Sequence, residues 1–139
     1  MLRKNKKIFV TIIIAFTIIF TISIFEQIYY FDQKSIANIF EVDAVYYEDK
    51  KYVEITFDDK SQKSSSITLE ILGMPKSYHK IFTKPSFIDR VNIDSIPQYG
   101  WKSMPVTFVV DHEDFGMIGI KMEIHPQNDP KKNVIFSRL

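Results

Sequence analysis

The stretch VTFVVDHEDFGMIGIKMEI, residues 106–124, consists of two alternating apolar runs on either side of a polar segment. Apolar side chains occupy every second position of both runs: Val106, Phe108 and Val110 in the first, and Ile118, Ile120, Met122 and Ile124 in the second. Successive residues of a strand point to opposite faces of a sheet, so this period predicts two strands that each bury one face. The stretch therefore predicts a β-hairpin at the centre of a hydrophobic core.

The polar segment between the runs predicts the turn of this hairpin. We expect Val110 to pair with Ile120, because the inward side chains of both strands then fall on one face. This register leaves a three-residue loop formed by Asp114, Phe115 and Gly116. Gly116 then lies where the backbone needs a left-handed conformation, and the carboxylate of Asp114 can accept backbone N–H bonds at the start of the loop.

The same segment also suggests a metal or acid–base site, because Asp111–Asp114 holds one histidine and three carboxylates. Three or four ligands must converge within about 2 to 2.5 Å of a metal ion. Consecutive strand residues point to opposite faces, so His112 points inward, away from the carboxylates that flank it. His125 lies at the far end of the same hairpin, and the sequence does not place His79. The three histidines are therefore only weak candidate metal ligands, and we expect no catalytic residue here.

Upstream of the hairpin the chain repeats the same alternation. The expected inward positions are Val53, Ile55 and Phe57 in one run, and Ile67, Leu69 and Ile71 in another. The polar residues 58–66 between these runs are expected to form a loop, with residues 61–66 solvated. Short alternating runs separated by turns, with no convincing amphipathic helix among them, are typical of an all-β domain.

We therefore predict an immunoglobulin- or fibronectin-like β-sandwich over residues 42–139, with a small open β-barrel as the alternative. A chain of 139 residues suits one such domain with a short appendage, and 45% hydrophobic residues are typical of a folded chain. The chain has no cysteine. Disulfides, thiolate metal sites and the cysteine pair that marks immunoglobulin domains are therefore excluded.

Tyr99 and Trp101 flank Gly100 and allow two interpretations. The two rings can fill the end of the core, where a buried aromatic ring removes about 150 to 250 Å² from water. Alternatively, they can form a stacking platform for a sugar or a peptide. The second interpretation requires both rings to be exposed on one face of the domain.

The N-terminal segment predicts a transmembrane helix. The run Ile8–Phe25 has 18 residues without a charge, a proline or a glycine. As a helix it would be about 27 Å long, close to the roughly 30 Å of a bilayer's hydrocarbon core. Aromatic residues at 29–31 suit the membrane interface, so the span can extend to about residue 31. A cleaved signal peptide is the main alternative, but its apolar region is usually about 7 to 15 residues long.

The charges on either side of this run predict its orientation. Four basic residues precede it within the first seven positions, whereas Glu26 and Asp32 follow it. The positive-inside rule then places the N-terminus in the cytoplasm and the rest of the chain outside the cytoplasmic membrane. The predicted division is a cytoplasmic tail (1–7), a transmembrane signal anchor (8–25), a juxtamembrane stalk or short helix (26–41) and an extracytoplasmic β-sandwich (42–139).

The composition and the absence of known motifs exclude several classes of function. After residue 25 the chain has 14 basic and 17 acidic residues, so it lacks the basic stripe that binds nucleic acid. No hydrolase, metalloprotease, P-loop or dinucleotide-binding motif occurs in it. We expect a non-enzymatic interaction or structural module without a cofactor. Its partners would be the lipid bilayer and a protein or cell-envelope component, or a second copy of the chain.

Two other functions stay open from the sequence. One is a cupredoxin-like, non-blue metal-binding domain, which combines histidine with methionine ligands. Its candidates are His79, His112 and His125 with Met104, Met117 and Met122. The other is a filament or pilin-like subunit assembled through the N-terminal helix, although the small residue that usually precedes a pilin's apolar run is missing here.

Overall fold

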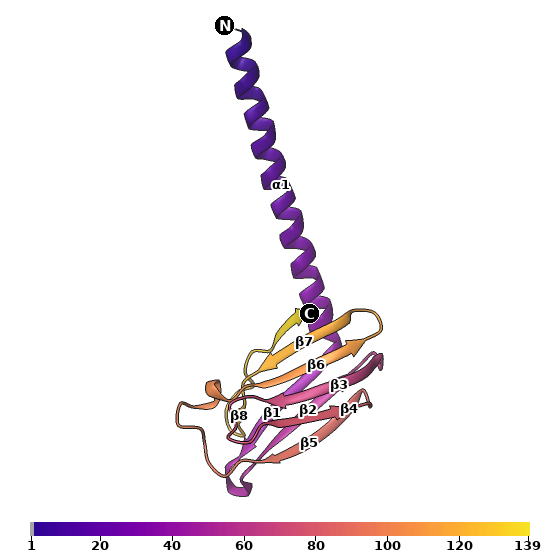
Figure 1. Ribbon diagram of the computed structural model, residues 1–139, viewed down its shortest axis with the longest axis vertical. Helices are drawn as coiled ribbons and strands as arrows, with labels where there is room; N and C mark the ends of the chain where they lie inside the picture. The colour runs from indigo at the N-terminus through magenta and orange to yellow at the C-terminus, as the bar shows by residue number, and fades with distance from the viewer. Residues whose placement is uncertain (1) are drawn as a thin grey trace. The chain divides into compact units, whose positions relative to one another are not determined.

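The computed structural model describes residues 2–139, with side chains at positions 10–26 and 33–139. The chain forms two compact units, which divide between Ser35 and Ile36. Helix α1 spans Leu2–Ile39 (Figure 1). Its residues up to Ser35 belong to the first unit, whereas its last turn belongs to the second unit together with the described strands. The segment predicted as a stalk or a short helix is thus helical as far as Ile39 and continuous with the apolar run.

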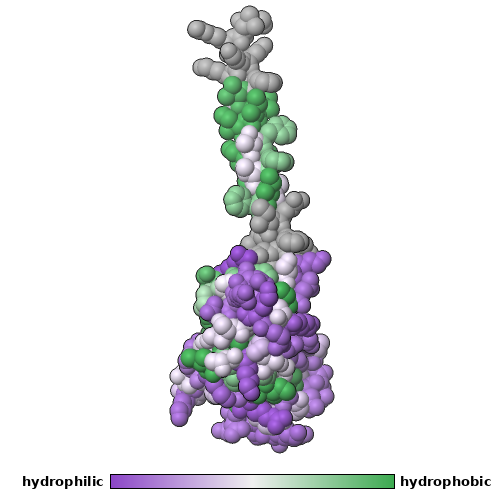
Figure 2. Space-filling view, turned by 90° about the vertical axis from the view of Figure 1, so that its right-hand side faces the viewer, coloured by the Kyte–Doolittle hydropathy of each residue, from purple (hydrophilic) through white to green (hydrophobic). Residues whose placement is uncertain are grey.

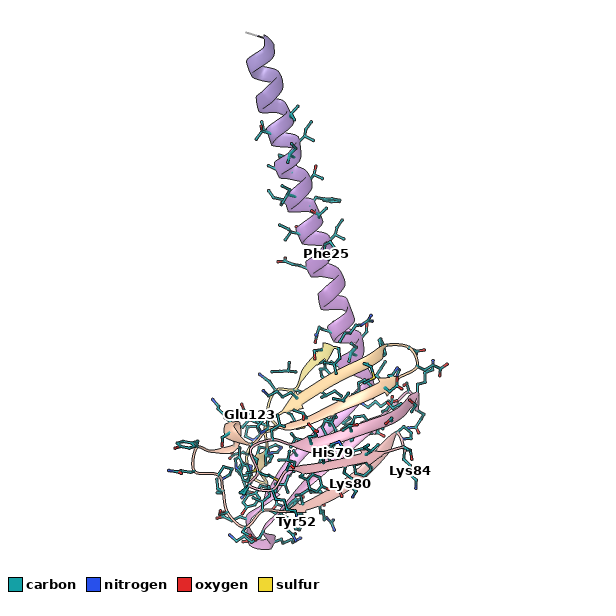
Figure 3. All side chains as sticks on the ribbon, viewed as in Figure 1. Phe25, Tyr52, His79, Lys80, Lys84 and Glu123 are labelled. Carbon is teal, nitrogen blue, oxygen red and sulfur yellow. The ribbon has the colours of Figure 1, made fainter. Side chains whose placement is uncertain are left out.

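Apolar side chains are exposed all around α1 between residues 10 and 25. Figure 2 shows this segment as an apolar surface, and in Figure 3 its side chains project on both sides of the ribbon as far as Phe25. The hydroxyl groups in it donate hydrogen bonds to carbonyl oxygens of the preceding turn: Thr17 to Ile13 at 2.8 Å, Thr21 to Ile18 at 2.8 Å and Ser23 to Ile19 at 3.0 Å. Among the described residues, no helix has both the length and the apolarity needed to cross a membrane.

The described strands of the second unit form two sheets (Figure 1). The strands are β1 (Phe40–Tyr47), β2 (Tyr52–Asp59), β3 (Ser64–Ile71), β4 (Tyr78–Phe82), β5 (Ser86–Asn92), β6 (Val106–His112), β7 (Gly116–Met122), β8 (His125–Pro126) and β9 (Ile135–Arg138). One sheet has the order β5-β2-β1-β8 and the other β4-β3-β6-β7-β9. Neighbouring strands are antiparallel except β1 and β8, which are parallel. Two short 3-10 turns, η1 (Glu48–Lys50) and η2 (Trp101–Ser103), lie in the connections.

The inward faces of both sheets form one hydrophobic core, which confirms the predicted β-sandwich architecture. Every position predicted to point inward is at most 2% exposed, and each such aliphatic or aromatic side chain contributes about 1.5 to 3 kcal/mol by burial. Ile36, in the last turn of α1, and Phe40 also belong to this core. The domain therefore starts at Ile36, slightly before the predicted boundary at residue 42.

The β6–β7 hairpin corrects the predicted register by two residues. Val110 pairs with Ile118 rather than Ile120, and His112 pairs with Gly116. The loop between the strands is therefore Glu113–Phe115, and Gly116 is already the first residue of β7. A shift of two residues leaves each side chain on its predicted face, since the side-chain period of a strand is two. The left-handed conformation expected for Gly116 is confirmed by its φ of 70°.

Polar and aromatic contacts connect the two sheets along one side of the sandwich. There β4 is the edge strand of one sheet and β5 is the edge strand of the other. The Tyr78 hydroxyl donates a hydrogen bond to Asp89, and the Lys80 ammonium donates one to the same carboxylate at 2.8 Å. Burial and the Asp89 hydrogen bond raise the pKa of Tyr78 well above its usual range. Next to them the rings of Phe82 and Phe87 stack with centroids 3.6 Å apart. These contacts tie the two sheets together at this side.

Candidate functional site

A cluster of buried polar side chains lies at the end of the sandwich that carries the β6–β7 hairpin. Asp59 is the last residue of β2, and Ser61 and Ser64 follow it in the connection to β3 and at its start. His112 is the last residue of β6, in the other sheet. Asp59 and His112 are 0% and 1% exposed, so their polar atoms need partners within the protein.

The Asp59 carboxylate is the centre of this cluster and accepts five hydrogen bonds. Its Oδ1 accepts from the Ser61 amide at 2.9 Å and the Ser61 hydroxyl at 2.6 Å. Its Oδ2 accepts from the Lys63 amide at 2.9 Å, and from the amide and hydroxyl of Ser64 at 2.8 and 2.7 Å. One side chain thereby fixes the course of the whole β2–β3 connection.

These bonds determine the charge state of Asp59. Burial alone raises the pKa of this carboxyl group, because it penalises the charged form. The hydrogen bonds from the hydroxyl and amide groups of Ser61 and Ser64 favour the charged form, and their sum lowers the pKa below its ordinary value of 3.8. Asp59 is therefore ionised at neutral pH.

The hydrogen bonds of His112 determine its tautomer. Its Nδ1 accepts a hydrogen bond from the Asp114 amide at 3.1 Å, so the neutral ring carries its proton on Nε2. Nε2 lies 2.9 Å from the Ser61 hydroxyl oxygen and 3.7 Å from Oδ2 of Asp59. The histidine therefore donates to Ser61, and Ser61 donates to Asp59.

The cluster has the residue types of a catalytic triad but the opposite hydrogen-bond polarity. In a triad the serine hydroxyl donates to a histidine nitrogen, and the carboxylate accepts from the other ring nitrogen. Here Ser61 accepts from the ring and donates to Asp59, so His112 cannot take its proton. Phe40 and Phe115 pack against the imidazole with ring centroids 5.6 and 4.9 Å away. The arrangement joins the β2–β3 connection to the β6–β7 hairpin and does not activate a nucleophile.

The polar loop predicted over residues 58–66 is shorter in the structure, because β2 extends to Asp59 and β3 starts at Ser64. The prediction that residues 61–66 are solvated is wrong for Ser64, which is buried. The sequence does contain a signal for this cluster. Asp59 follows Phe57 by two residues and His112 follows Val110 by two, so both polar residues continue an inward alternation. Two polar residues at the ends of inward series must find partners inside the protein, and an aspartate with a serine two residues later is typical of a turn.

The other two candidate histidines have partners of their own. His79 lies on the outer face of β4, with Nε2 3.8 Å from Glu70. His125, in β8, is 5% exposed and has its Nε2 3.0 Å from Asp43 and its Nδ1 2.9 Å from the Pro126 carbonyl. Both ring nitrogens of His125 therefore have a polar partner within the protein.

The structure does not bring the candidate metal ligands together. Within the described part of the chain, no group of three or more histidine, aspartate or glutamate side chains could hold a metal ion. The methionines of the metal-binding alternative are also distributed: Met104 and Met122 are buried in the core, and Met117 is 44% exposed on β7.

Tyr99 and Trp101 have different surroundings. Trp101 is half-buried and packs against Tyr46, with ring centroids 4.8 Å apart. Tyr99 is 82% exposed and lines a cavity of about 450 Å³ together with Ile96 and Pro97. Only Tyr99 is therefore open to stacking on a ligand, and Trp101 mainly extends the core.

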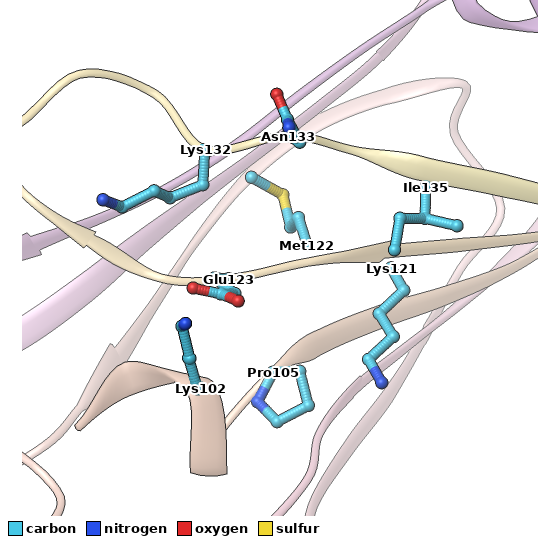
Figure 4. A pocket seen from close by; sticks show the side chains of 8 residues that line it. All are labelled: Lys102, Pro105, Lys121, Met122, Glu123, Lys132, Asn133 and Ile135. Carbon is cyan, nitrogen blue, oxygen red and sulfur yellow. The ribbon is translucent and has the colours of Figure 1, made fainter. Parts of the chain in front are cut away.

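A second cavity, of about 350 Å³, is lined by three lysines from three separate segments. Lys102 is in η2, Lys121 is on β7, and Lys132 is in the connection between β8 and β9. Its other lining residues are Pro105, Met122, Glu123, Asn133 and Ile135. Figure 4 shows Lys102 directed toward Glu123, while Lys121 and Lys132 extend away from that carboxylate. Sequence analysis missed this pocket, because the three lysines are far apart along the chain.

Comparison with protein-family models, curated proteins and solved structures gives no match to this chain. A functional proposal therefore has to rest on the residues themselves. The buried cluster and the histidine pairs have structural partners, whereas the lysine pocket and the Tyr99 cavity open onto the surface.

Proposed function

We propose that the chain is a single-pass membrane protein that holds its β-sandwich outside the cytoplasmic membrane as a non-enzymatic interaction or structural module. The observation that carries this proposal is the apolar surface of α1. Phe16, Phe20 and Phe25 are 71%, 67% and 75% exposed, and apolar neighbours are exposed on every other side of the helix. A helix that is apolar all round is normally buried in a large core or in a membrane.

The hydroxyl groups of α1 support the same interpretation. Lipid offers no hydrogen-bond partners, so polar groups within a span must be satisfied inside the protein. Thr17, Thr21 and Ser23 donate to carbonyl oxygens of their own helix. These residues then carry no unpaired donor into the bilayer. The proposed span is the full sequence run Ile8–Phe25, and the described side chains cover it from Val10 onward.

The proposed orientation, with residues 1–7 in the cytoplasm, rests on the four basic residues before the run and the acidic residues after it. It makes Ile36–Leu139 an extracytoplasmic domain. A domain with this many buried aliphatic residues needs no disulfide for stability, which is consistent with the absence of cysteine.

We also propose that the sandwich is of the immunoglobulin or fibronectin type. The first, second and fifth strands form one sheet, and the third, sixth and seventh form the other. Immunoglobulin domains distribute their strands in this way. β4 joins the edge of the second sheet, and the short strands β8 and β9 extend one sheet each. Such domains commonly present loops and sheet faces to partners, which supports a role in interaction.

Alkaline carbonate extraction of membranes from cells that express the full chain tests the anchor. We expect the chain to stay in the membrane pellet, and a Phe16→Asp/Thr17→Asp variant to move to the supernatant. Each carboxylate at the middle of a span costs about 2.5 to 3.5 kcal/mol of insertion free energy. Phe16→Leu/Thr17→Val is the matched control and should stay in the pellet. Extraction of the unmodified chain by carbonate would contradict the proposed anchor.

A further inference from the structure

We propose that the lysine pocket, formed by Lys102, Lys121, Lys132 and the residues between them, binds a phosphate monoester with a small apolar group. The pocket lies entirely within the unit Ile36–Leu139, so this inference does not depend on the membrane anchor. Four observations carry it: the local charge, the lack of ion-pair partners, the type of cation and the apolar wall.

The pocket is positive in a domain that is negative overall. Residues 36–139 contain 13 basic and 15 acidic residues, a net charge of −2. Three lysines and one glutamate line the pocket and give it a local charge of +2. This charge matches that of a phosphate monoester, which carries about −1.5 to −2 at pH 7.

The three ammonium groups of the pocket are free to bind a ligand. Three other lysines of the domain are paired: Lys60 with Glu41 at 3.2 Å, Lys63 with Asp114 at 2.9 Å and Lys80 with Asp89 at 2.8 Å. Among the described residues, Lys102, Lys121 and Lys132 take part in none of the ion pairs. The three side chains point in different directions in Figure 4, and their flexible four-carbon stems would let the ammonium groups turn toward a bound anion.

The type of cation favours phosphate over carboxylate. Arginine presents a planar fork that suits a carboxylate, but none of the described residues that line the pocket is an arginine. Lysine acts as a point charge with three donors and is a common phosphate ligand. The Asn133 amide can add one further donor.

The apolar wall and the size of the pocket indicate the rest of the ligand. Pro105 and Met122 contribute to the lining but are buried, whereas Ile135 is 63% exposed. The volume of about 350 Å³ exceeds what one phosphate group needs and falls in the range of small-molecule sites. An alkyl group next to the phosphate would cover the exposed side chain of Ile135.

Binding can be measured on the full chain through Trp101, its only tryptophan, which adjoins Lys102. The chain is purified in a neutral, phosphate-free detergent and titrated with n-butyl phosphate at pH 8 and constant ionic strength. We expect saturable binding that is tighter than that of inorganic phosphate, and no response to n-butanol. Lys102→Gln, Lys121→Gln and Lys132→Gln should each weaken the affinity about tenfold, since each removes a charge-assisted hydrogen bond.

Two further variants separate specific binding from misfolding and from general attraction of anions. Glu123→Gln should tighten n-butyl phosphate binding about threefold, because it removes the one negative charge of the pocket. Lys84→Gln should change nothing, since Lys84 lies at the opposite end of the sandwich from Glu123 (Figure 3). Absence of saturable binding, or equal affinities for all of these variants, would overturn the proposal.

The phosphate can belong to a soluble metabolite or to a lipid headgroup, and one more titration distinguishes these sources. Dihexanoyl phosphatidic acid below its micellar concentration presents the same phosphate monoester on a lipid backbone. Affinity at least about tenfold above that of n-butyl phosphate, lost in Lys102→Gln, would identify a lipid headgroup. Equal affinity would identify a soluble phosphate monoester.

Discussion

Asp59→Asn is expected to destabilise the domain by about 3 kcal/mol, because the amide cannot accept the hydrogen bonds that the carboxylate accepts. In asparagine an NH₂ group replaces one of the two carboxylate oxygens. In place of Oδ1 it would face the donors of Ser61, and in place of Oδ2 it would face the donors of Lys63 and Ser64. Buried donors without acceptors cost about 1 to 3 kcal/mol each. Urea unfolding of the full chain in detergent, followed by circular dichroism, measures the difference.

The neighbouring Asp58→Asn variant is the matched control, because Asp58 lies on the outer face of β2 and is only half-buried. It should change the free energy of unfolding by less than about 0.5 kcal/mol. Equal effects of the two substitutions would contradict the central role of Asp59 in the β2–β3 connection.

The effect of Asp59→Asn should also depend on pH in a defined direction. The folded-state pKa of Asp59 lies below its ordinary value of 3.8. The stability from the charged carboxylate is therefore fully present above the unfolded-state pKa, and is lost as the pH falls through the folded-state pKa. The difference between the two proteins should be constant near neutral pH and shrink below about pH 4. A constant difference down to pH 2 would show that charge plays no part.

Gly73→Ala is expected to cost about 3 to 4 kcal/mol, the second large effect. Gly73 has a φ of 80°, a conformation that costs a residue with a side chain about 1 to 2 kcal/mol. A Cβ atom there would also lie 2.2 Å from the Ser103 carbonyl oxygen, so the backbone of η2 would have to move. Overpacking of this kind typically costs about 1 to 3 kcal/mol.

Gly116→Ala separates the two contributions to the Gly73 effect. Gly116 has a similar φ of 70°, but beyond its two chain neighbours no atom lies within 4 Å of a Cβ atom built on it. It should therefore lose only the conformational part, about 1 to 2 kcal/mol. Thermal unfolding followed by circular dichroism compares the two variants with the unmodified chain. Equal losses for both would show that the contact between Gly73 and η2 does not matter.

The alternation of apolar residues predicted the strands and their faces well, because every second position of a half-buried strand must be apolar. Val53, Ile55 and Phe57, for example, are all buried as expected. The same alternation could not set the register of the β6–β7 hairpin. Registers that differ by two residues bury the same side chains, and Gly116 serves as the left-handed residue in both.

The candidate sites were harder to predict, because their residues meet only in the folded chain. His112 could be assigned to the inward face from its parity, but its contact with Ser61 depends on how the β2–β3 connection folds. The three pocket lysines come from η2, β7 and the segment after β8, and no local pattern connects these segments. Long-range contacts of this kind carry no signal in the spacing of a single sequence.

The membrane topology of the chain is tested most directly by labelling single cysteines, because the native chain contains none. Ser95→Cys places a thiol on an exposed position of the domain, Lys4→Cys places one in the basic tail, and Ala44→Cys places one in the core as a control. Spheroplasts that express each variant are treated with a membrane-impermeant maleimide. Ser95→Cys should be labelled in intact spheroplasts, Lys4→Cys only after permeabilisation and Ala44→Cys only after denaturation. Labelling of Lys4→Cys but not of Ser95→Cys in intact spheroplasts would contradict the proposed topology.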